Sequence, residues 1–270
     1  MSGFLPTYLS YTGFKTYNTC PQQYYLNYIR KMRPEVEDER NVLNGIALHD
    51  LMEAYLNGDE QDPQWLVQNV EEFWHQTQVG RFISFRHETD AADLLAKIKK
   101  WAKALAALMD EHGLTPAKCT PELKADTEIE IHDATIKLGG RIDLTFKNSK
   151  GNYVFFDLKA SENRAVMQFD QIVWYALVLG IYLKDHSQPQ AGGYILPGFN
   201  EVSLYEVPMS AKQNMINRIW QVMNDIKDEK FDPAPDNSKC YWCSVKHVCP
   251  AKGGLMPEGT GIVDLGALNG

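Results

Sequence analysis

The stretch IKLGGRIDLTFKNSKGNYVFFDLK, residues 136–159, decides the fold, because apolar and polar residues alternate on both sides of a turn. The alternation predicts two antiparallel strands joined over residues 148–152. If the turn is centred on Lys150 without a bulge, facing residues have numbers that sum to 300. Asp143 then faces Asp157, and Arg141 faces Lys159. Four ionic groups are therefore expected on one face of the hairpin.

These four groups suit the hydrolysis of a phosphodiester bond. Two carboxylates this close repel unless a cation lies between them, and Mg²⁺ or Mn²⁺ prefers oxygen ligands. Two facing cations likewise favour a bridging anion such as phosphate. Hydrolysis uses a metal that activates water and a lysine that holds the water or stabilises the developing charge. The alternative is a hairpin with ordinary charges on its solvent-exposed face.

The rest of the chain predicts a mixed α/β fold with a helical insertion before the hairpin. Asp90 is expected to cap a long helix that Gly113 ends. Helices are expected at residues 10–29, interrupted at Cys20-Pro21, and at 45–56, 65–74, 90–112, 164–183 and 210–227. Further strands are expected near residues 128–131, 192–196 and 203–207.

The net charge argues against a nucleic-acid ligand, but the distribution of charge does not. The 270 residues are 44% hydrophobic and carry a formal charge of −8. Residues 35–93 hold fourteen acidic and three basic residues, a balance of −11, so the remainder carries +3. Because binding responds to the local field, the total charge does not exclude a polyanionic ligand.

Composition also bounds the compartment. The chain has no uninterrupted run of about 18 apolar residues, so no membrane span is expected. The first residues, Met1 to Pro6, lack the pattern of a secretory signal. A cytoplasmic location is therefore expected, where thiols stay reduced and the five cysteines need an explanation other than disulfides.

Three of those cysteines form the compact pattern Cys240-x₂-Cys243-x₅-Cys249, which predicts a metal or cluster site. A tetrahedral site needs a fourth ligand. The candidates are Cys20, at a helix start before Pro21, and also Cys119 and His247. Zinc and a [4Fe–4S] cluster both fit the spacing.

Three further polar residues are candidates for a site. His49 lies at the edge of the apolar stripe of its helix, where a histidine is usually a packed side chain. Gln171 and Tyr175 are four residues apart and share a face of an otherwise apolar helix. They either contact a ligand or pair with each other internally.

Taken together in the order in which they occur along the chain, these motifs resemble those of the RecB-like branch of the PD-(D/E)XK nuclease superfamily. Within that branch the chain is most similar to the iron–sulfur exonucleases associated with CRISPR adaptation and to their phage-borne relatives. The matching pieces are Leu9-Ser10 through Cys20-Pro21 with Tyr25, Gly45 to His49, Gly140 to Asp143, Asp157-Leu158-Lys159, Gln171-x₃-Tyr175, and the Cys240, Cys243 and Cys249 pattern.

The resemblance implies a role for each matched residue. His49, Asp143, Asp157 and the carbonyl of Leu158 would bind Mn²⁺ or Mg²⁺, and Lys159 would be the catalytic lysine. Gln171 and Tyr175 would form a catalytic motif that touches DNA, with Arg141 also guiding the strand. A [4Fe–4S] cluster would be held by Cys20, Cys240, Cys243 and Cys249. Cys119, Glu128 and Glu130 match nothing, and Asp157 stands where relatives often have glutamate.

The implied fold is α/β, with a restriction-endonuclease-like mixed β-sheet core flanked by helices. The expected organisation is one nuclease domain over residues 1–255, with a helical insertion at 35–115 and a flexible tail at 256–270. Residues 1–30 and 236–252 would be joined at a C-terminal iron–sulfur segment.

The implied function is a metal-dependent exonuclease acting on DNA ends, with single-stranded DNA as the expected substrate and a structural cluster. The alternatives are an endonuclease or nickase on the same scaffold, and a catalytically idle DNA-binding or partner-binding subunit. A homo-oligomer or DNA-processing protein partners are possible, and no membrane partner is expected.

Overall fold

The computed structural model describes residues 8–32, 40–85, 87–132, 134–184 and 191–252. The chain divides into two compact units. Unit 1 contains Met1–Glu37, Glu130–Ile136 and Ile216–Gly270, and unit 2 contains Asp38–Ile129 and Lys137–Met215. Residues 256–270 of the expected tail lie outside the described residues. The boundaries at 35, 115 and 255 stay predictions.

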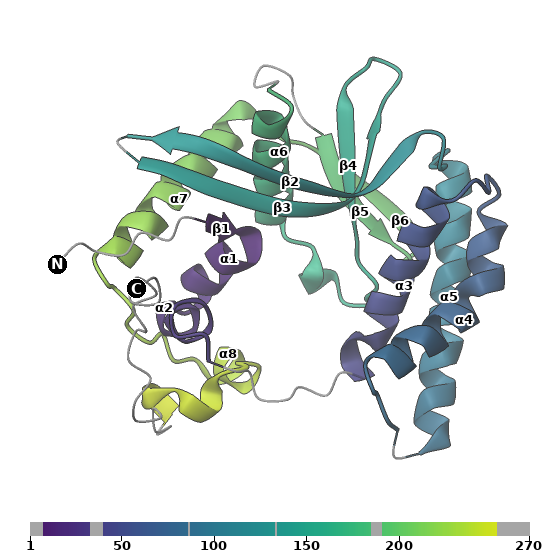
Figure 1. Ribbon diagram of the computed structural model, residues 1–270, viewed down its shortest axis with the longest axis horizontal. Helices are drawn as coiled ribbons and strands as arrows, with labels where there is room; N and C mark the ends of the chain where they lie inside the picture. Colours follow the sequence, from purple (N-terminus) through teal and green to yellow (C-terminus); the bar gives the residue numbers. More distant parts are fainter. Residues whose placement is uncertain (1–7, 33–39, 86, 133, 185–190, 253–270) are drawn as a thin grey trace, which may run out of the picture. The chain divides into compact units, whose positions relative to one another are not determined.

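Three long helices of unit 2 pack against one another, in the region where the sequence predicts a helical insertion (Figure 1). They are α3 (Arg40–Asn57), α4 (Gln64–Gly80) and α5 (Glu88–Glu111). Asn44 of α3 links them, because it accepts a hydrogen bond from Trp74 Nε1 at 2.8 Å and donates one to the Leu94 carbonyl at 2.8 Å. The buried amide is thereby satisfied inside an apolar core.

The ends of α5 correct one detail of the sequence prediction. His87, in an extended conformation, is the N-cap, so Asp90 lies inside the first turn. A carboxylate there still interacts favourably with the helix dipole. Gly113 follows the helix with a φ of +60°, a conformation that favours glycine, as predicted.

The sheet of unit 2 is mixed, as expected. Its strands are β2 (Cys119–Ile131), β3 (Ala134–Lys147), β4 (Tyr153–Leu158), β5 (Ala191–Leu196) and β6 (Glu201–Glu206), and the ends of β2 and β3 over Glu130–Ile136 belong to unit 1. The order β3-β4-β5-β6, with β2 paired to β3, combines antiparallel β3–β4 and β5–β6 pairs with a parallel β4–β5 pair.

The predicted register of the central hairpin is confirmed. Pairing runs from Leu144↔Phe156 to Lys147↔Tyr153, and each pair sums to 300. The Asn148 side chain accepts hydrogen bonds from the amides of Lys150 and Asn152, both at 3.0 Å, and so stabilises the turn.

The crossover between the parallel strands β4 and β5 is α6 (Phe169–Tyr182), preceded by a 3₁₀ turn at Arg164–Val166. Ten consecutive residues of α6, from Gln171 to Gly180, are buried. The stretch Arg164–Tyr182 is long and apolar enough to cross a membrane, but 56% of its apolar window is buried inside the protein. The sequence predicts no span, and this burial is typical of a core helix.

Unit 1 brings the two ends of the described chain together. Its N-terminal part is β1 (Tyr8–Ser10), α1 (Tyr11–Thr19), α2 (Pro21–Tyr24) and a π-helical turn at Tyr25–Ile29. The C-terminal part is most of α7 (Met209–Lys227), then α8 (Asn237–Tyr241) and 3₁₀ turns at Lys246–Val248 and Pro250–Lys252. The Tyr17 hydroxyl donates to the Lys230 carbonyl at 2.7 Å, which ties the parts together (Figure 1).

Candidate active site

Two carboxylates lie at the centre of the candidate site in unit 2, and both are buried. Asp143, on β3, is 8% exposed, and Asp157, on β4, is 4% exposed. The amide of Leu158 donates to Asp143 Oδ2 at 2.7 Å, which fixes this carboxylate beside the end of β4. The alternative of ordinary solvent-exposed charges therefore does not describe these two residues.

Lys159 follows directly after β4 and reaches back to the site. Its Nζ lies 2.7 Å from Asp157 Oδ2, and its backbone amide donates to the Ile195 carbonyl of β5 at 3.0 Å. The Lys159 side chain is 23% exposed, so its ammonium contacts a buried acid while remaining accessible from solvent. From this position the ammonium group can contact the Asp157 carboxylate and a molecule in solvent at the same time.

His49 comes to the same place from α3. Its Nε2 lies 3.0 Å from the Leu158 carbonyl oxygen, and its Nδ1 lies 3.5 Å from Asp143 Oδ2. Burial lowers the pKa of His49, which favours the neutral ring that binds metals. The structure thus brings together His49, Asp143, Asp157, Leu158 and Lys159 from two strands and one helix.

Glu122, on β2, is a residue of the site that the sequence analysis missed. One ligand atom each from His49, Glu122 and Asp143 lie within 4.8 Å of one another, a grouping that could hold a metal ion. The β2 strand begins nine residues before the strand expected at residues 128–131, because Pro121 and several charged residues obscure the alternation. Glu128, which the sequence left unassigned, pairs instead with Lys137 at 3.4 Å.

Arg141 interacts with two glutamates. It bonds Glu122 through Nε, and its Nη2 lies 3.6 Å from Glu53 Oε2. These two glutamates compensate the charge of Arg141. The guanidinium therefore does not need the anion expected to bridge Arg141 and Lys159. Its guanidinium side chain is 66% exposed, and its contact with DNA stays a prediction.

Gln171 and Tyr175 of α6 are both buried and form a hydrogen bond with each other, which was one of the two predicted alternatives. Gln171 Nε2 donates to Asp157 Oδ1 at 2.9 Å and to the Tyr175 hydroxyl at 3.2 Å. A Cβ atom added at Gly140 would lie 3.1 Å from the Tyr175 ring, so this glycine lets α6 approach β3 closely. Gln171 therefore orients Asp157, and the DNA contact of Tyr175 stays a prediction.

The electrostatics of the site favour a bound cation. Burial raises the pKa of Asp143 to about 7, and burial with the Asp143 charge raises the pKa of Asp157 to about 6. Burial also raises the pKa of Glu122. Each shift means that the ionised carboxylate is disfavoured by its surroundings. A divalent cation would remove this penalty, because it neutralises the carboxylates that bind it.

Mn²⁺ binding is expected to weaken as the pH falls from 7.5 to 5.5. The raised pKa values mean that the folded protein holds protons on Asp143 and Asp157 at pH 5.5, and Mn²⁺ must displace them. Titration calorimetry should show affinity at least about tenfold lower at pH 5.5. Without metal, the raised pKa values stabilise the fold at low pH, and this contribution is lost as the pH rises to about 7.

The matched control for this pH dependence is Asp143→Asn, which has no carboxyl to titrate and should bind Mn²⁺ weakly at both pH values. Equal affinity of the wild type at pH 5.5 and 7.5 would contradict the assignment of these carboxylates to the metal.

A family model described as the PD-(D/E)XK nuclease superfamily matches residues 8–250. The chain belongs to the PD-(D/E)XK nuclease superfamily. Asp157-Leu158-Lys159 fits the (D/E)XK part of that name, with Asp143 as the preceding acid. Membership implies a metal-dependent nuclease with DNA as its substrate, and the helix-flanked mixed sheet is consistent with the superfamily fold.

Several solved structures are similar to this member of the superfamily. One, SSO0001, is 17% identical with a TM-score of 0.34, over 77% of this chain and 96% of that one. A protein from Eubacterium rectale named "Putative exonuclease" is 14% identical with a TM-score of 0.49, over 89% and 87% of the two chains. Rai1 of Scheffersomyces stipitis is 12% identical with a TM-score of 0.24, over 81% and 71%. No match was found among curated proteins.

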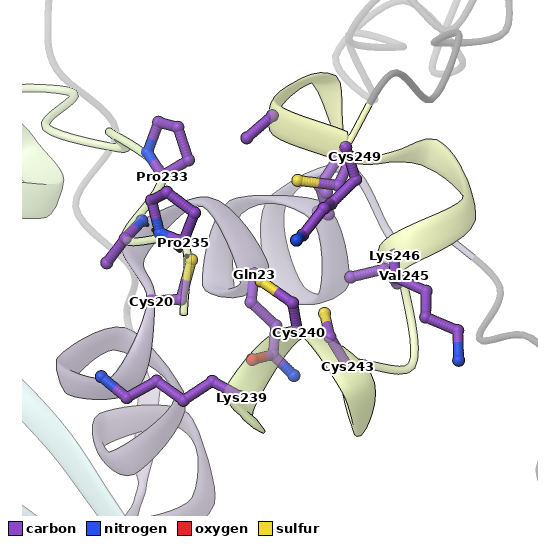
Figure 2. Close-up of a pocket in the computed structure, with 14 residues that line it drawn as sticks. Cys20, Gln23, Pro233, Pro235, Lys239, Cys240, Cys243, Val245, Lys246 and Cys249 are labelled. Atoms are coloured by element: carbon purple, nitrogen blue, oxygen red, sulfur yellow. Dashed lines mark hydrogen bonds between the residues drawn. The ribbon is translucent and has the colours of Figure 1, made fainter. Parts of the chain in front are cut away.

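A second cluster of side chains lies within unit 1, where four cysteines line one pocket (Figure 2). Cys20 comes from the junction of α1 and α2, and Cys240, Cys243 and Cys249 come from the C-terminal segment. The amide of Ala234 donates to Cys20 Sγ at 3.4 Å. Burial raises the pKa of Cys243, and the other three thiols add to this shift.

The two other candidates for a ligand are not part of this pocket. Cys119 belongs to unit 2, where it is buried in the apolar core and burial raises its pKa to about 11. His247 is exposed and does not line the pocket. Within the described part of unit 1, the pocket therefore combines the four cysteines that the resemblance implied.

Proposed function

We propose that the chain is a metal-dependent exonuclease that degrades single-stranded DNA from its ends and carries a structural [4Fe–4S] cluster. The observation that carries the proposal is the meeting of Asp143, Asp157, Lys159, His49 and the Leu158 carbonyl at one place. A buried pair of acids with a lysine is the donor set that phosphodiester hydrolysis uses. This complete set argues against a catalytically idle subunit.

The chemistry of the donors supports Mn²⁺ or Mg²⁺ at this site. His49 Nε2 and the Leu158 carbonyl oxygen lie 3.0 Å apart, so the imidazole and the carbonyl are next to each other. Asp143 keeps Oδ1 for a metal while Oδ2 accepts from the Leu158 amide. Glu122 would add a further oxygen, and carboxylate, carbonyl and imidazole donors suit these ions.

When bound, the divalent ion would lower the pKa of a water molecule and neutralise charge on the phosphate. Lys159 would donate hydrogen bonds to the attacking water or to a phosphate oxygen, because its ammonium is accessible beside Asp157. Gln171 would hold Asp157 in its ligating orientation through its bond to Oδ1, and Tyr175 would hold Gln171.

Arg141 would contact the phosphate backbone of the DNA. Glu122 and Glu53 hold its guanidinium in place, while most of the side chain remains exposed. The planar guanidinium of arginine presents a fork of N–H donors that can bind two oxygens of a phosphate. The same contact would link the substrate to Glu122, so that substrate and metal ligand interact through one arginine.

The four-cysteine pocket supports a [4Fe–4S] cluster, as in the iron–sulfur branch that the sequence resembles. The cluster would neutralise four thiolates whose mutual repulsion is otherwise unfavourable. Leu26, Val245 and Val248 supply an apolar wall, and the Ala234 amide donates to one sulfur. Joining both ends of the described chain would make this cluster structural. A reducing compartment such as the cytoplasm would keep the thiols available.

The experiment that tests the exonuclease proposal compares linear and circular single-stranded DNA of the same sequence with Mn²⁺. Linear DNA is expected to lose nucleotides progressively from its ends, and the circle is expected to stay intact. Electrophoresis and measurement of acid-soluble nucleotides report both results. Cleavage of the circle at a comparable rate would replace the proposal with an endonuclease, and no cleavage of either would refute nuclease activity.

A further inference from the structure

Two adjacent aromatic side chains stand out on the surface of unit 1, between two of the pocket cysteines. Tyr241 is 67% exposed and Trp242 is 75% exposed. Their ring centroids are 4.8 Å apart and the rings are nearly perpendicular, at 85°. A tryptophan exposed to this extent forgoes much of the stabilisation that its burial would give. A paired, exposed aromatic surface is typical of a binding site.

Local contacts hold Tyr241 in place, and the ring of Trp242 packs edge-on against it. Cys240 and Cys243 flank the pair in the sequence, and Tyr241 ends α8. Lys246 Nζ donates to the Tyr241 carbonyl at 3.2 Å and lies 5.7 Å from the centre of its ring. Side chains that are already ordered lose less conformational freedom when a ligand binds.

The charge around the aromatic pair is mainly positive. Residues 237–252 contain three lysines and no acidic residue, although the whole chain carries −8. Asp236, directly before this segment, caps α8 by accepting from the amides of Ser238 and Lys239. Lys239, Lys246 and Lys252 all line the cysteine pocket beside the pair, and Figure 2 shows Lys239 and Lys246 there. Part of this positive charge would balance the negative charge of a cluster. A cluster does not explain why a tryptophan is exposed beside the lysines.

We propose that Tyr241 and Trp242 form a stacking platform for the bases of single-stranded DNA, whose phosphates are contacted by the neighbouring lysines. Exposed aromatic faces interleaved with basic residues are the combination that binds single strands without sequence preference. Duplex bases already stack on each other, so the platform selects unpaired bases. The choice of DNA rests on the proposed nuclease function, whereas the choice of a single strand rests on this surface.

A second copy of the chain is a poorer occupant. In a two-fold symmetric dimer the same patch faces itself, so the three lysines would lie near three more lysines. The segment 237–252 has no acidic residue, and Asp236 directly before it balances only one of the three charges. A polyanion removes the repulsion and adds the release of counterions.

The test measures binding of a labelled oligothymidylate of about 20 nucleotides to the full chain by fluorescence anisotropy, without added divalent ions. Trp242→Ala is expected to weaken binding at least about fivefold, the lower end of the effect of losing one stacked base. Trp242→Phe is expected to keep most of the affinity, because phenylalanine still stacks. The fraction of tryptophan emission quenched by the oligonucleotide should fall in Trp242→Phe, since the stacked indole is gone.

The matched control is Phe82→Ala. Phe82, in unit 2, is 93% exposed but lies within the acidic stretch 35–93, so its loss should leave the affinity unchanged. Iron content and melting temperature show whether each variant keeps its fold. If Trp242→Ala does not fold, the quenching measured with Trp242→Phe tests the platform. Wild-type affinity and quenching in Trp242→Phe and Trp242→Ala would overturn the platform. A change in sedimentation with DNA affinity unchanged would assign the pair to a protein contact instead.

Failure of the platform is distinguishable from failure of the nuclease proposal. If the wild type binds the oligonucleotide through Trp242 but releases no nucleotides with Mn²⁺, the platform stands and the nuclease proposal fails. If the wild type degrades linear DNA and Trp242→Ala binds it equally well, the platform is wrong and the nuclease proposal stands.

Discussion

Lys159→Ala is expected to reduce Mn²⁺-dependent release of nucleotides from linear single-stranded DNA by about 100-fold or more, the usual effect of removing one positioned donor to the transition state. Lys159 Nζ lies 2.7 Å from Asp157 Oδ2 and is accessible from solvent, so it can reach both the metal-binding acid and a phosphate. Mn²⁺ affinity should persist, because an ammonium is not a metal ligand. Acid-soluble nucleotide release and titration calorimetry measure the two effects.

Lys137→Ala is the matched control for this variant. Lys137 also lies in unit 2, on β3, but it is exposed and pairs with Glu128 at the surface. Its removal should leave the rate within about twofold, because an exposed ion pair contributes little. Equal activity of Lys159→Ala and wild type would refute the catalytic role of Lys159.

Cys20→Ala is expected to lose nearly all bound iron and to melt at a markedly lower temperature. Cys20 is the single N-terminal ligand in the proposed set, so its loss would remove the link through the cluster, although the Tyr17–Lys230 hydrogen bond still joins the two parts. Structural zinc sites in small domains contribute on the order of 10 kcal/mol to folding, so losing a structural cluster is expected to have a large effect. Iron and sulfide analysis of anaerobically purified protein, its visible absorption and thermal denaturation provide the measurements.

Cys119→Ala is the control for cysteine loss. Cys119 is buried in the core of unit 2 with a pKa raised to about 11, so this variant should keep its iron and lose only about 1 kcal/mol by forming a small cavity. A requirement for Cys119 instead of Cys20 would break the proposed ligand set. Colourless wild-type protein with one equivalent of zinc would replace the iron–sulfur cluster with a zinc site.

The register of the β3–β4 hairpin was predictable because it depends on local features. Alternation fixes which residues face the core, and a short turn without a bulge fixes which residues pair. The sequence therefore placed Asp143 and Asp157 beside each other, and the observed pairs around Leu144 and Phe156 agree. The helix break at Cys20-Pro21 was predictable for a similar reason, since proline fits only the first turn of a helix.

The partners of the site residues were not predictable in the same way. Glu122 reaches His49 and Asp143 only because β2 pairs with β3, and no local pattern marked its strand. Gln171 was open to two interpretations until the packing of α6 directed its amide to Asp157. Arg141 was expected opposite a cation, yet two glutamates from other elements hold it.

The sequence by itself thus determined the mixed α/β class, the hairpin register, the family resemblance and the cysteines suited to a cluster. These properties follow from periodicity and spacing over short stretches of chain. Only the tertiary structure decided that the two carboxylates are buried, that Glu122 joins them, and that Cys20 rather than Cys119 lies with the C-terminal cysteines. Burial and long-range contacts depend on how distant elements pack, and that packing sets the charge balance on which metal binding depends.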